Sequence, residues 1–509
     1  MRFIIGIDIG TTHTKAIALN SDGFVAATAL VGYEPLTDAA GKHELLLAEV
    51  FDAVMQVWKD VMDSMRQQGA TQPEGIAFSS AMHSLIAVDE AGQPLTGCIT
   101  WADLRSQPQA ATLKTSGLAE DLYRHTGTPV HPMSPLCKLI WLRETEPAIF
   151  HKAAKFIGIK EYILQLLTGE YFVDQSIASS TGLLDIQTRE WYAPALELAG
   201  IGKDRLSDIV STTFIHTGIK GPYAAFTGTD AGIPLVAGAS DGCLANIGSN
   251  ALEPGDLSIT IGTSGAVRMI ADKPATDPHS RVFNYILDEA HYVCGGPLNN
   301  GGALIEWYAA HFLQRDIREE QVMEQLIAEA AAVPAGAEGL IFLPYVRGER
   351  APVWDASARG AFVGLDHRHT QAHALRAVFE GINYAVYDIS KAVKETMGEA
   401  KNIFVSGGFL RSPQWVQWLT DLMGQRLILT ATADASALGA AILGWKATGF
   451  FSGLSGARKF FQQQRAYEPD PMHHRTLQQY YEVYAALYNS LQHSFQELAR
   501  LRNDDQLSL

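Results

Sequence analysis

The sequence lacks the patterns that mark several large classes of protein. Its four cysteines, Cys98, Cys137, Cys243 and Cys294, form no Cys-x-x-Cys pair, so neither a disulfide framework nor a zinc site is predicted. No apolar run approaches the roughly 18–20 residues that a membrane span needs. There is no Walker loop, no Gly-x-Gly-x-x-Gly and no paired-histidine zinc motif. The sites that depend on those motifs are therefore excluded.

Positive charge is also scarce. The chain has 39 Lys and Arg against 55 Asp and Glu, a net charge of −16, and no basic patch interleaved with aromatic residues. Such a surface repels nucleic acid and anionic membranes, so we expect neither as a partner. The apolar N-terminal run contains Asp8 and no cleavage region, so a signal peptide is not predicted and we expect a cytoplasmic location.

What the sequence does contain is a repeated phrase. Residues 5–19 read IGIDIGTTHTKAIAL and residues 257–270 read LSITIGTSGAVRMI, each an apolar strand, a Gly/Thr turn and a second strand. The two phrases lie about half a chain apart, which indicates duplication of a whole domain. The length of 509 residues also favours two or more domains. Residues 246–254, rich in Asn, Ser, Gly and Pro, are the predicted boundary.

Helices are expected between and after these phrases, which makes the chain an α/β protein. A further strand, Asn402–Ser406, precedes a Gly-Gly turn. The predicted helices are Ala48–Gln68, Pro135–Arg143, Lys160–Leu167, Gly302–Leu313, Arg318–Ala332, Gln371–Glu395, Pro413–Met423 and His474–Arg502.

The first chemical motif is the turn Asp8–Lys15. A glycine turn exposes backbone N–H groups, and the hydroxyls of the two threonines with the ammonium of Lys15 add donors that suit a polyphosphate. Asp8 could hold a magnesium ion through water. An ordinary hairpin turn with a solvated aspartate is the alternative.

Two further turns are weaker when taken alone. Gly262–Gly265 fits a plain turn as well as a phosphate loop, but paired with the first motif it suggests two hydroxyl-rich hairpins that clamp phosphates. Ser406–Phe409 places paired glycines after a strand, where a flat ring could approach the backbone, or where a simple strand-to-helix turn could lie.

The segment Gly238–Gly242 allows three interpretations. As Gly-x-Ser-x-Gly it would present Ser240 as the nucleophile of a hydrolase. As an exposed carboxylate among small residues, Asp241 would be a general base that takes a proton from a substrate hydroxyl. As a loop it would only cap the following helix.

A last group of residues suits a polyol. Met82 and His83 follow a predicted strand, and Trp101, Asp103 and Arg105 come about twenty residues later. The imidazole, carboxylate and guanidinium groups offer donors and acceptors to hydroxyls, and the indole could pack on the carbon skeleton. A satisfied core histidine is the alternative for His83.

In this order the motifs resemble the FGGY carbohydrate kinases, members of the actin, hexokinase and heat-shock chaperone superfamily. The resemblance covers roughly residues 3–450. It includes the runs from Met133 to Leu142 and from Gly360 to Glu380, with Thr145 and Ala374 departing from the family pattern. It implies two actin-like, ribonuclease H-like ATPase domains, each with a mixed five-stranded sheet flanked by helices, and a cleft between them. The domains would span residues 1–245 and 255–450, followed by a helical extension, 451–509.

The resemblance also implies roles for single residues. Asp241 matches the catalytic aspartate of the family, which argues against Ser240 as the nucleophile of a hydrolase. Met82 and His83 match a sugar-contacting pair. ATP with Mg²⁺ would be the phosphate donor. The positions that match nucleotide-contacting residues are Thr11, Thr12, His13, Lys15, Thr263, Gly302, Glu306, Gly408 and Ser412.

Within the family, the segments MHSLIAVDEAGQPL, ITWADLRS and GTPVHPMSPLCKLIWL look most like the gluconate kinase branch. This likeness implies phosphorylation of D-gluconate to 6-phospho-D-gluconate, with Arg105 or Lys138 near the carboxylate. Xylulose or another sugar or polyol is the alternative substrate. A serine hydrolase and a non-catalytic ATP-binding sensor are distant alternatives. A homodimer would be unsurprising, and Glu349-Arg350 and the terminal helix have no predicted role.

Overall fold

The structure is a computed structural model that describes residues 1–430, 434–461 and 465–507, the last six of these by their backbone alone. The chain forms two compact units. Unit 1 comprises Met1–Pro254, Ile270–Cys294 and Asp434–Gln462, and unit 2 comprises Gly255–Met269, Gly295–Ala433 and Gln463–Leu509. These units differ from the three predicted segments in that residues 270–294 and 434–462 belong to unit 1 and residues 463–509 belong to unit 2. The segments themselves stay a prediction.

The two units share one strand order. In unit 1 the order is β3-β2-β1-β6-β15, and in unit 2 it is β19-β17-β16-β22-β23. The strands of unit 1 are β1 (Phe3–Ile9), β2 (His13–Asn20), β3 (Val25–Gly32), β6 (Ile76–Ser80) and β15 (Pro234–Ser240). The strands of the second sheet, most of whose residues lie in unit 2, are β16 (Asp256–Ile261), β17 (Gly265–Ala271), β19 (Tyr292–Leu298), β22 (Asn402–Ser406) and β23 (Leu427–Leu429).

Strand directions match as well. In unit 1, β1 is antiparallel to β2 and parallel to β6, which is parallel to β15. In unit 2, β16 is antiparallel to β17 and parallel to β22, which is parallel to β23. The predicted duplication of a domain with a mixed five-stranded sheet is therefore confirmed. Each sheet is wider than predicted, because β14 (Ile215–Thr217) adds to β15 and β24 (Ala466–Tyr467) adds to β23.

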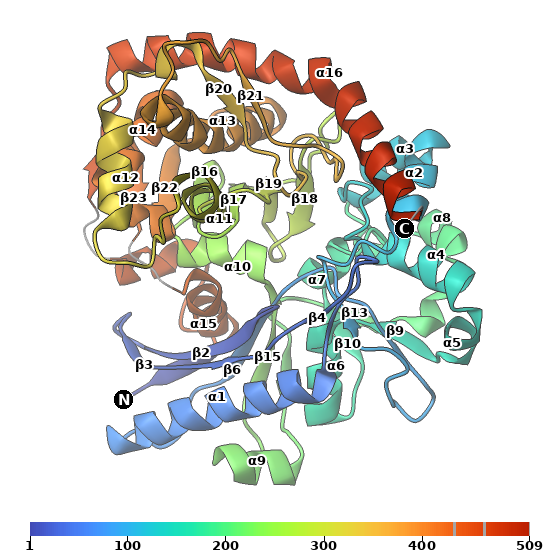
Figure 1. Ribbon diagram of the computed structural model, residues 1–509. Coiled ribbons are helices and arrows are strands. Elements are labelled where there is room, and N and C mark those ends of the chain that lie inside the picture. Colours follow the sequence, from blue (N-terminus) through green and yellow to red (C-terminus); the bar gives the residue numbers. More distant parts are fainter. Residues whose placement is uncertain (431–433, 462–464, 508–509) are drawn as a thin grey trace. The chain divides into compact units, whose positions relative to one another are not determined.

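The core of unit 1 follows from the alternation of side chains along β1. The odd-numbered residues from Phe3 to Ile9 pack with α1 (Leu47–Gln67), whereas Ile4 packs with α15 (Ala435–Ala447) on the other face. Gly6 lies on the α15 face, where an added Cβ would be 2.2 Å from the Ala437 carbonyl oxygen. The sheet is thus covered on both faces, with α1 along one side (Figure 1).

Two glycines allow α15 to contact α10 (Asp241–Gly248) backbone to backbone. A Cβ on Gly248 would lie 1.9 Å from the Ala435 oxygen, and one on Gly439 would lie 2.0 Å from the Leu244 oxygen. The first residue of α15, Ala435, thus lies against the last residue of α10, Gly248. The Ser436 hydroxyl donates to the Asp241 backbone oxygen at 3.2 Å.

In unit 2, helices cover the sheet and surround a core rich in tyrosine. α16 (Pro471–Leu507) packs against α13 (Gln371–Met397) and α14 (Pro413–Met423), and α12 (Val322–Ala331) packs against the same two helices. The buried tyrosines of this core are Tyr345, Tyr384, Tyr481, Tyr484 and Tyr488.

The predicted strand Asn402–Ser406 (β22) and the predicted helix Pro413–Met423 (α14) have their predicted bounds. The predicted helix Gly302–Leu313 is instead α11 (Ala303–Tyr308) followed by a π-helical turn, Ala309–Leu313. The predicted helix from Arg318 begins only at Val322. Among the described residues, no helix is both long and apolar enough to cross a membrane.

The remaining elements are short and mostly belong to unit 1. They are β4 (Leu36–Thr37), β5 (His43–Leu45), β7 (Ile86–Val88), β8 (Cys98–Ile99), α2 (Gln107–Thr115), α3 (Leu118–Thr126), α4 (Pro135–Thr145), α5 (Pro147–Lys152), β9 (Lys155–Ile157), α6 (Ile159–Thr168), β10 (Phe172–Asp174), α7 (Gln175–Ser179), β11 (Leu184–Asp185), β12 (Glu190–Trp191), α8 (Ala193–Ala199), β13 (Asp208–Val210), α9 (Gly221–Thr227), β18 (Phe283–Ile286), β20 (Ile341–Leu343) and β21 (Ala361–Val363).

Candidate active site

Three parallel strands of unit 1 end at the same edge of the sheet. Asp8 of β1 is opposite Ser79 of β6, and Ser80 of β6 is opposite Ser240 of β15. Ligands of open α/β sheets bind at the carboxyl ends of such strands. The segments that leave this edge are the hairpin after Asp8, Met82-His83 and Asp241, so the fold gathers three of the predicted motifs.

The first hairpin is a tight turn held by its own backbone. The Gly10 N–H donates to the His13 oxygen at 3.0 Å, and the Thr12 and His13 side chains are exposed. The Thr12 hydroxyl lies 3.0 Å from Nδ1 of His13. Burial lowers the pKa of His13, and the charge of Lys15 lowers it further, so the ring is neutral near pH 7. The turn therefore offers hydroxyl and backbone donors to an anion.

Asp8 and Lys15 sit beside this hairpin. The Ser79 hydroxyl donates to Oδ1 of Asp8 at 2.6 Å. Burial raises the pKa of Asp8, while the Ser79 hydrogen bond and the Lys15 charge lower it. Lys15 forms an ion pair with Asp434, which precedes α15. Sequence reasoning missed Asp434, whose only local signal is an acidic residue before a helix rich in Gly and Ala.

Asp241 is the first residue of α10. It is partly exposed, and its Oδ1 accepts the Gly242 N–H at 2.7 Å. β15 carries a register shift between Val236 and Ala239, where Gly238 has φ +72° and an added Cβ would be 1.7 Å from the Phe78 oxygen. Such an irregularity bends the end of a strand and re-aims the side chains beyond it. The carboxylate is thus placed at the sheet edge with a side open to solvent.

Ser240 does not have the environment of a hydrolase nucleophile. Its side chain is fully buried, and its hydroxyl accepts from the Cys243 N–H at 3.4 Å and from the Ser176 hydroxyl at 3.1 Å. It is the N-cap of α10. A nucleophile elbow needs an exposed hydroxyl, so the hydrolase interpretation is excluded by the fold.

His83 has a strained, well-defined conformation. Its φ is +69°, its Nδ1 is 2.8 Å from the Ser180 oxygen and its Nε2 is 3.4 Å from the Tyr285 hydroxyl. Because a carbonyl only accepts, Nδ1 carries the hydrogen, which leaves Nε2 as the acceptor of the neutral ring. Non-glycine residues in this region of φ cluster at functional sites. Tyr285 was not among the predicted residues.

Met82 and Trp101 lie next to the first hairpin. Together with Gly10 and Thr11 they line a cavity of about 10 Å³. The structure thereby brings two predicted substrate residues and one predicted phosphate residue to one place in unit 1.

Asp103 and Arg105 bind each other. The Asp103 carboxylate is buried and accepts from the Arg105 guanidinium at 2.7–3.1 Å and from the His43 N–H at 2.9 Å. Arg105 also pairs with Glu44 at 2.6 Å and lies over the Trp141 ring at 4.4 Å. These bonds hold the two side chains together, and their contact with a substrate stays a prediction.

Lys138 is entirely buried beneath His83. Its ammonium donates to the backbone oxygens of His83 (2.5 Å) and Met133 (2.9 Å), and burial lowers its pKa to about 7. It therefore holds the His83 backbone in place, which is a different role from the suggested contact with a substrate carboxylate.

A second buried cation supports the strand end before Asp241. Lys160 of α6 donates to the Ala239 oxygen at 3.0 Å and pairs with Asp174 at 2.6 Å. Asp174 in turn caps α7 by accepting the Ile177 N–H. No sequence motif indicated this pair.

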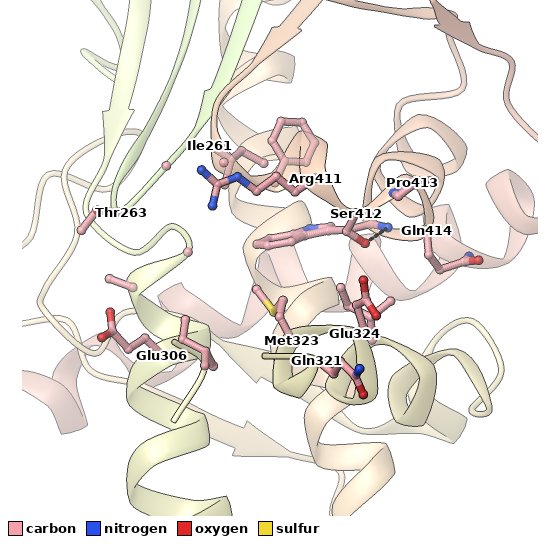
Figure 2. A pocket seen from close by; sticks show the side chains of 18 of the residues that line it. Ile261, Thr263, Glu306, Gln321, Met323, Glu324, Arg411, Ser412, Pro413 and Gln414 are labelled. Carbon is pink, nitrogen blue, oxygen red and sulfur yellow. Dashed lines mark hydrogen bonds between the residues drawn. The ribbon is translucent and has the colours of Figure 1, made fainter. Parts of the chain in front are cut away.

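Unit 2 contains a large pocket beside the second hairpin. Its volume is about 890 Å³, and the predicted nucleotide residues of unit 2 all line it (Figure 2). These residues are Thr263, Gly302, Glu306, Gly408 and Ser412. The loop before α11 closes on the hairpin, because the Gly302 N–H donates to the Gly262 oxygen at 2.6 Å.

The other wall of the pocket is the turn between β22 and α14. Gly407 has φ +107° and would place a Cβ 2.4 Å from the Ile261 oxygen, whereas nothing lies within 4 Å of a Cβ on Gly408. Ser412 caps α14 by accepting the Trp415 N–H at 3.1 Å. Phe409, Met323 and Trp415 add apolar surface. Polar and charged side chains, among them Glu306, Glu324 and Arg411, line it as well, so the cleft offers apolar surface to a base and hydrogen-bonding groups to a ribose.

Comparison with known proteins agrees with this geometry. Residues 3–248 match the N-terminal domain and residues 257–448 the C-terminal domain of the FGGY family of carbohydrate kinases. A gluconokinase of Bacillus licheniformis is 43% identical over 88% of both chains. A gluconate kinase structure from Lactobacillus acidophilus superposes with a TM-score of 0.92 at 36% identity, over 98% of this chain and 99% of the other.

A xylulose kinase structure from the same organism is similar to almost the same degree. It has a TM-score of 0.93 at 35% identity and covers 98% of this chain and all of the other. The fold, the two matched domains and the identity to the gluconokinase agree with one another. The chain belongs to the FGGY family of carbohydrate kinases.

Proposed function

We propose that this kinase transfers the γ-phosphoryl group of ATP to the terminal hydroxyl of D-gluconate and forms 6-phospho-D-gluconate. The observation that carries the substrate is the 43% identity to a gluconokinase over 88% of the chain, against 35% to a xylulose kinase of the same fold. Xylulose remains the second candidate because of that shared fold.

In this proposal Asp241 is the catalytic base. Its carboxylate emerges at the sheet edge that also carries the first hairpin and His83, and it is open to solvent on one side. It would accept the proton of the attacking hydroxyl. A positioned general base contributes roughly 10²–10⁴ in rate, and positioning with charge stabilisation supplies most of the rest in phosphoryl transfer.

The base of ATP would occupy the pocket of unit 2, and its phosphates would contact the hairpin Gly262–Gly265 of the same unit. Thr11, Thr12, His13 and Lys15 are the proposed donors of the first hairpin, and Thr263 that of the second. Mg²⁺ would neutralise charge on the phosphates. It binds proteins through one or two carboxylates and otherwise keeps water and phosphate ligands, so the single carboxylate of Asp8 fits a water-mediated contact.

Substrate residues would be those gathered at the sheet edge of unit 1. We propose that His83 contacts the substrate and that Met82 and Trp101 contact its carbon skeleton, in line with the place of Met82 and Trp101 beside the hairpin. Asp103 and Arg105 remain proposed substrate contacts. A cytoplasmic location and a homodimer also remain predictions.

The test is a coupled assay of ADP release with gluconate, xylulose, ribulose, fuculose and glycerol. We expect kcat/KM to be at least tenfold higher for gluconate than for any other acceptor. A higher value for xylulose would establish the second candidate instead. ATP binding without ADP release from any acceptor would identify a non-catalytic sensor and contradict the proposal.

A further inference from the structure

Glu349 is a buried carboxylate that the proposed reaction does not use. It is 1% exposed and lies in unit 2, beside the loop that follows β19. Its Oε1 accepts the Asn299 N–H at 2.6 Å and the Arg350 N–H at 2.9 Å, and its Oε2 accepts from the Asn300 amide at 3.0 Å. Buried carboxylates are costly unless such donors satisfy them. The bonds therefore fix Asn299 and Asn300 relative to Glu349.

A second residue strengthens the same attachment. The Arg350 guanidinium donates to the Asn299 side-chain oxygen at 2.7 Å, and the Asn300 amide donates to the Gly348 oxygen at 2.8 Å. The Arg347 N–H donates to the Asn300 side-chain oxygen at 3.2 Å. Both side chains of the Asn299-Asn300 pair are thus held by residues 347–350.

The loop held in this way forms the support of the second hairpin. Asn300 is followed by Gly301 and Gly302, and the N–H groups of Gly302 and Ala303 donate to the Gly262 and Thr263 oxygens at 2.6 and 3.2 Å. A Cβ on Gly301 would lie 2.6 Å from the Ser264 oxygen, so the two backbones are in direct contact. A displacement of the loop would move the hairpin with it.

Residues 347–350 are braced in turn by the C-terminal helix. Glu349 and Asp355 exchange two backbone hydrogen bonds of 2.9 Å each. The Asp355 carboxylate accepts from the Tyr488 hydroxyl of α16 at 2.9 Å. A continuous set of bonds therefore runs from α16 through Asp355 and Glu349 to the hairpin at the pocket.

We propose that Glu349 is a positioning residue for ATP, because it holds the Asn299–Gly302 loop against the hairpin Gly262–Gly265 and so fixes the orientation of the phosphate-binding donors. Tyr488 supports Glu349 from the C-terminal helix. This inference rests on the proposed nucleotide site, and it assigns a role to two parts of the chain that had none. Oriented donors matter here because phosphate binding depends on several N–H and hydroxyl groups converging on one point.

The experiment measures binding of a non-hydrolysable ATP analogue with Mg²⁺ by isothermal titration calorimetry, together with the two KM values. Glu349→Gln keeps the size of the side chain but turns one acceptor into a donor that faces the Asn300 amide. We expect the Kd of the analogue and the KM for ATP to rise about tenfold, since a hydrogen bond to a charged group contributes that much. The KM for gluconate should stay within twofold.

Glu380→Gln is the matched control. Glu380 is a buried carboxylate of α13 in the same unit, and it accepts from Arg376 (2.6 Å) and from the Gly336 N–H (3.0 Å), neither of which lines the pocket. This variant should lower the melting temperature as Glu349→Gln does, but it should leave the affinity for the analogue within twofold. An equal loss of affinity in both variants would show general destabilisation and overturn the proposal.

Tyr488→Phe keeps the inference testable if Glu349→Gln does not fold. It removes one hydroxyl and should raise the Kd of the analogue two- to threefold. If Glu349→Gln folds and binds the analogue with the wild-type Kd, this inference is refuted while the proposed nucleotide site stands. If Glu349→Gln does not fold, a folded Tyr488→Phe protein with the wild-type Kd refutes it in the same way. A wild-type protein that binds no analogue refutes the proposed nucleotide site and this inference together.

Discussion

Replacement of Asp241 by Asn tests the chemistry with the least change in shape. The side chain begins α10, and its Oδ1 accepts the Gly242 N–H at 2.7 Å, a bond that an asparagine oxygen can also accept. The carboxylate's negative charge at the helix N-terminus is worth about 0.3–1 kcal/mol of stability, and the amide forfeits it. Folding should therefore survive the exchange, while the ability to take up a proton is lost.

The size of the kinetic effect follows from the role. A general base contributes roughly 10²–10⁴ in rate, equivalent to roughly 2.7–5.4 kcal/mol of transition-state stabilisation. We expect kcat for gluconate to fall by at least a hundredfold. The affinity for ATP should not change, because Asp241 is neither one of the proposed phosphate donors nor a lining residue of the nucleotide pocket.

The assay is ADP release at saturating ATP and gluconate, with a calorimetric Kd for the ATP analogue. Ser240→Ala is the control one residue away: it removes a buried helix cap, so it should cost about 1 kcal/mol of unfolding free energy and leave kcat within threefold. If Asp241→Asn retains more than a fifth of the wild-type kcat, Asp241 is not the base and the reasoning from the sheet edge is wrong.

Three further predictions concern other contacts of unit 1. Gly439→Ala should lower the unfolding free energy, measured by urea titration, by at least about 2 kcal/mol, because the new Cβ would clash with the Leu244 oxygen despite alanine's better helix propensity. Gly453→Ala is the control: nothing lies within 4 Å of its Cβ, so the unfolding free energy should change by less than about 0.5 kcal/mol. Asp288→Asn should cost about 2–3 kcal/mol at pH 7, since it leaves Lys446 and His291 without a buried carboxylate. Although burial opposes its ionisation, these partners hold the pKa of Asp288 well below its usual range, so its stabilising effect is complete above about pH 4 and is lost as the pH falls further. The difference in unfolding free energy from wild type should therefore narrow as the pH falls below about 4, and a constant difference would contradict the ion-pair explanation. Lys15→Met should raise the KM for ATP by about ten- to a hundredfold, and an unchanged value would remove Lys15 from the proposed phosphate site.

Much of the frame was open to prediction from local patterns. The strand β22 has its predicted bounds, because a short apolar run indicates a buried strand and the Gly-Gly turn marks its end. The repeated phrase at residues 5–19 and 257–270 predicted two related domains, because each copy has the same strand–turn–strand pattern and therefore forms the same hairpin. The pocket residues of unit 2 were predicted only through the family resemblance, since a lone Gly-Gly turn is compatible with many structures.

Other features depended on contacts between residues far apart in the chain. Lys15 and Asp434 are 419 positions apart and meet because α15 packs against β1 and β2, where Gly6 leaves room for the Ala437 carbonyl oxygen. The letters Gly-Ala-Ser-Asp-Gly are equally compatible with a nucleophilic serine and with a catalytic aspartate, and the tertiary structure decided between them by burying Ser240 as a cap and leaving Asp241 partly exposed.

Glu349 illustrates the same difference between what local sequence determines and what tertiary contacts determine. By itself the sequence determined where chains turn, which segments are apolar and how strands and helices alternate, because those properties are set by neighbours along the backbone. Only the tertiary structure decided which polar groups share a buried environment and therefore which carboxylate supports a hairpin, which one pairs with a lysine and which one stays open to solvent. That choice depends on desolvation and on donors from distant segments, and neither is written in a local pattern.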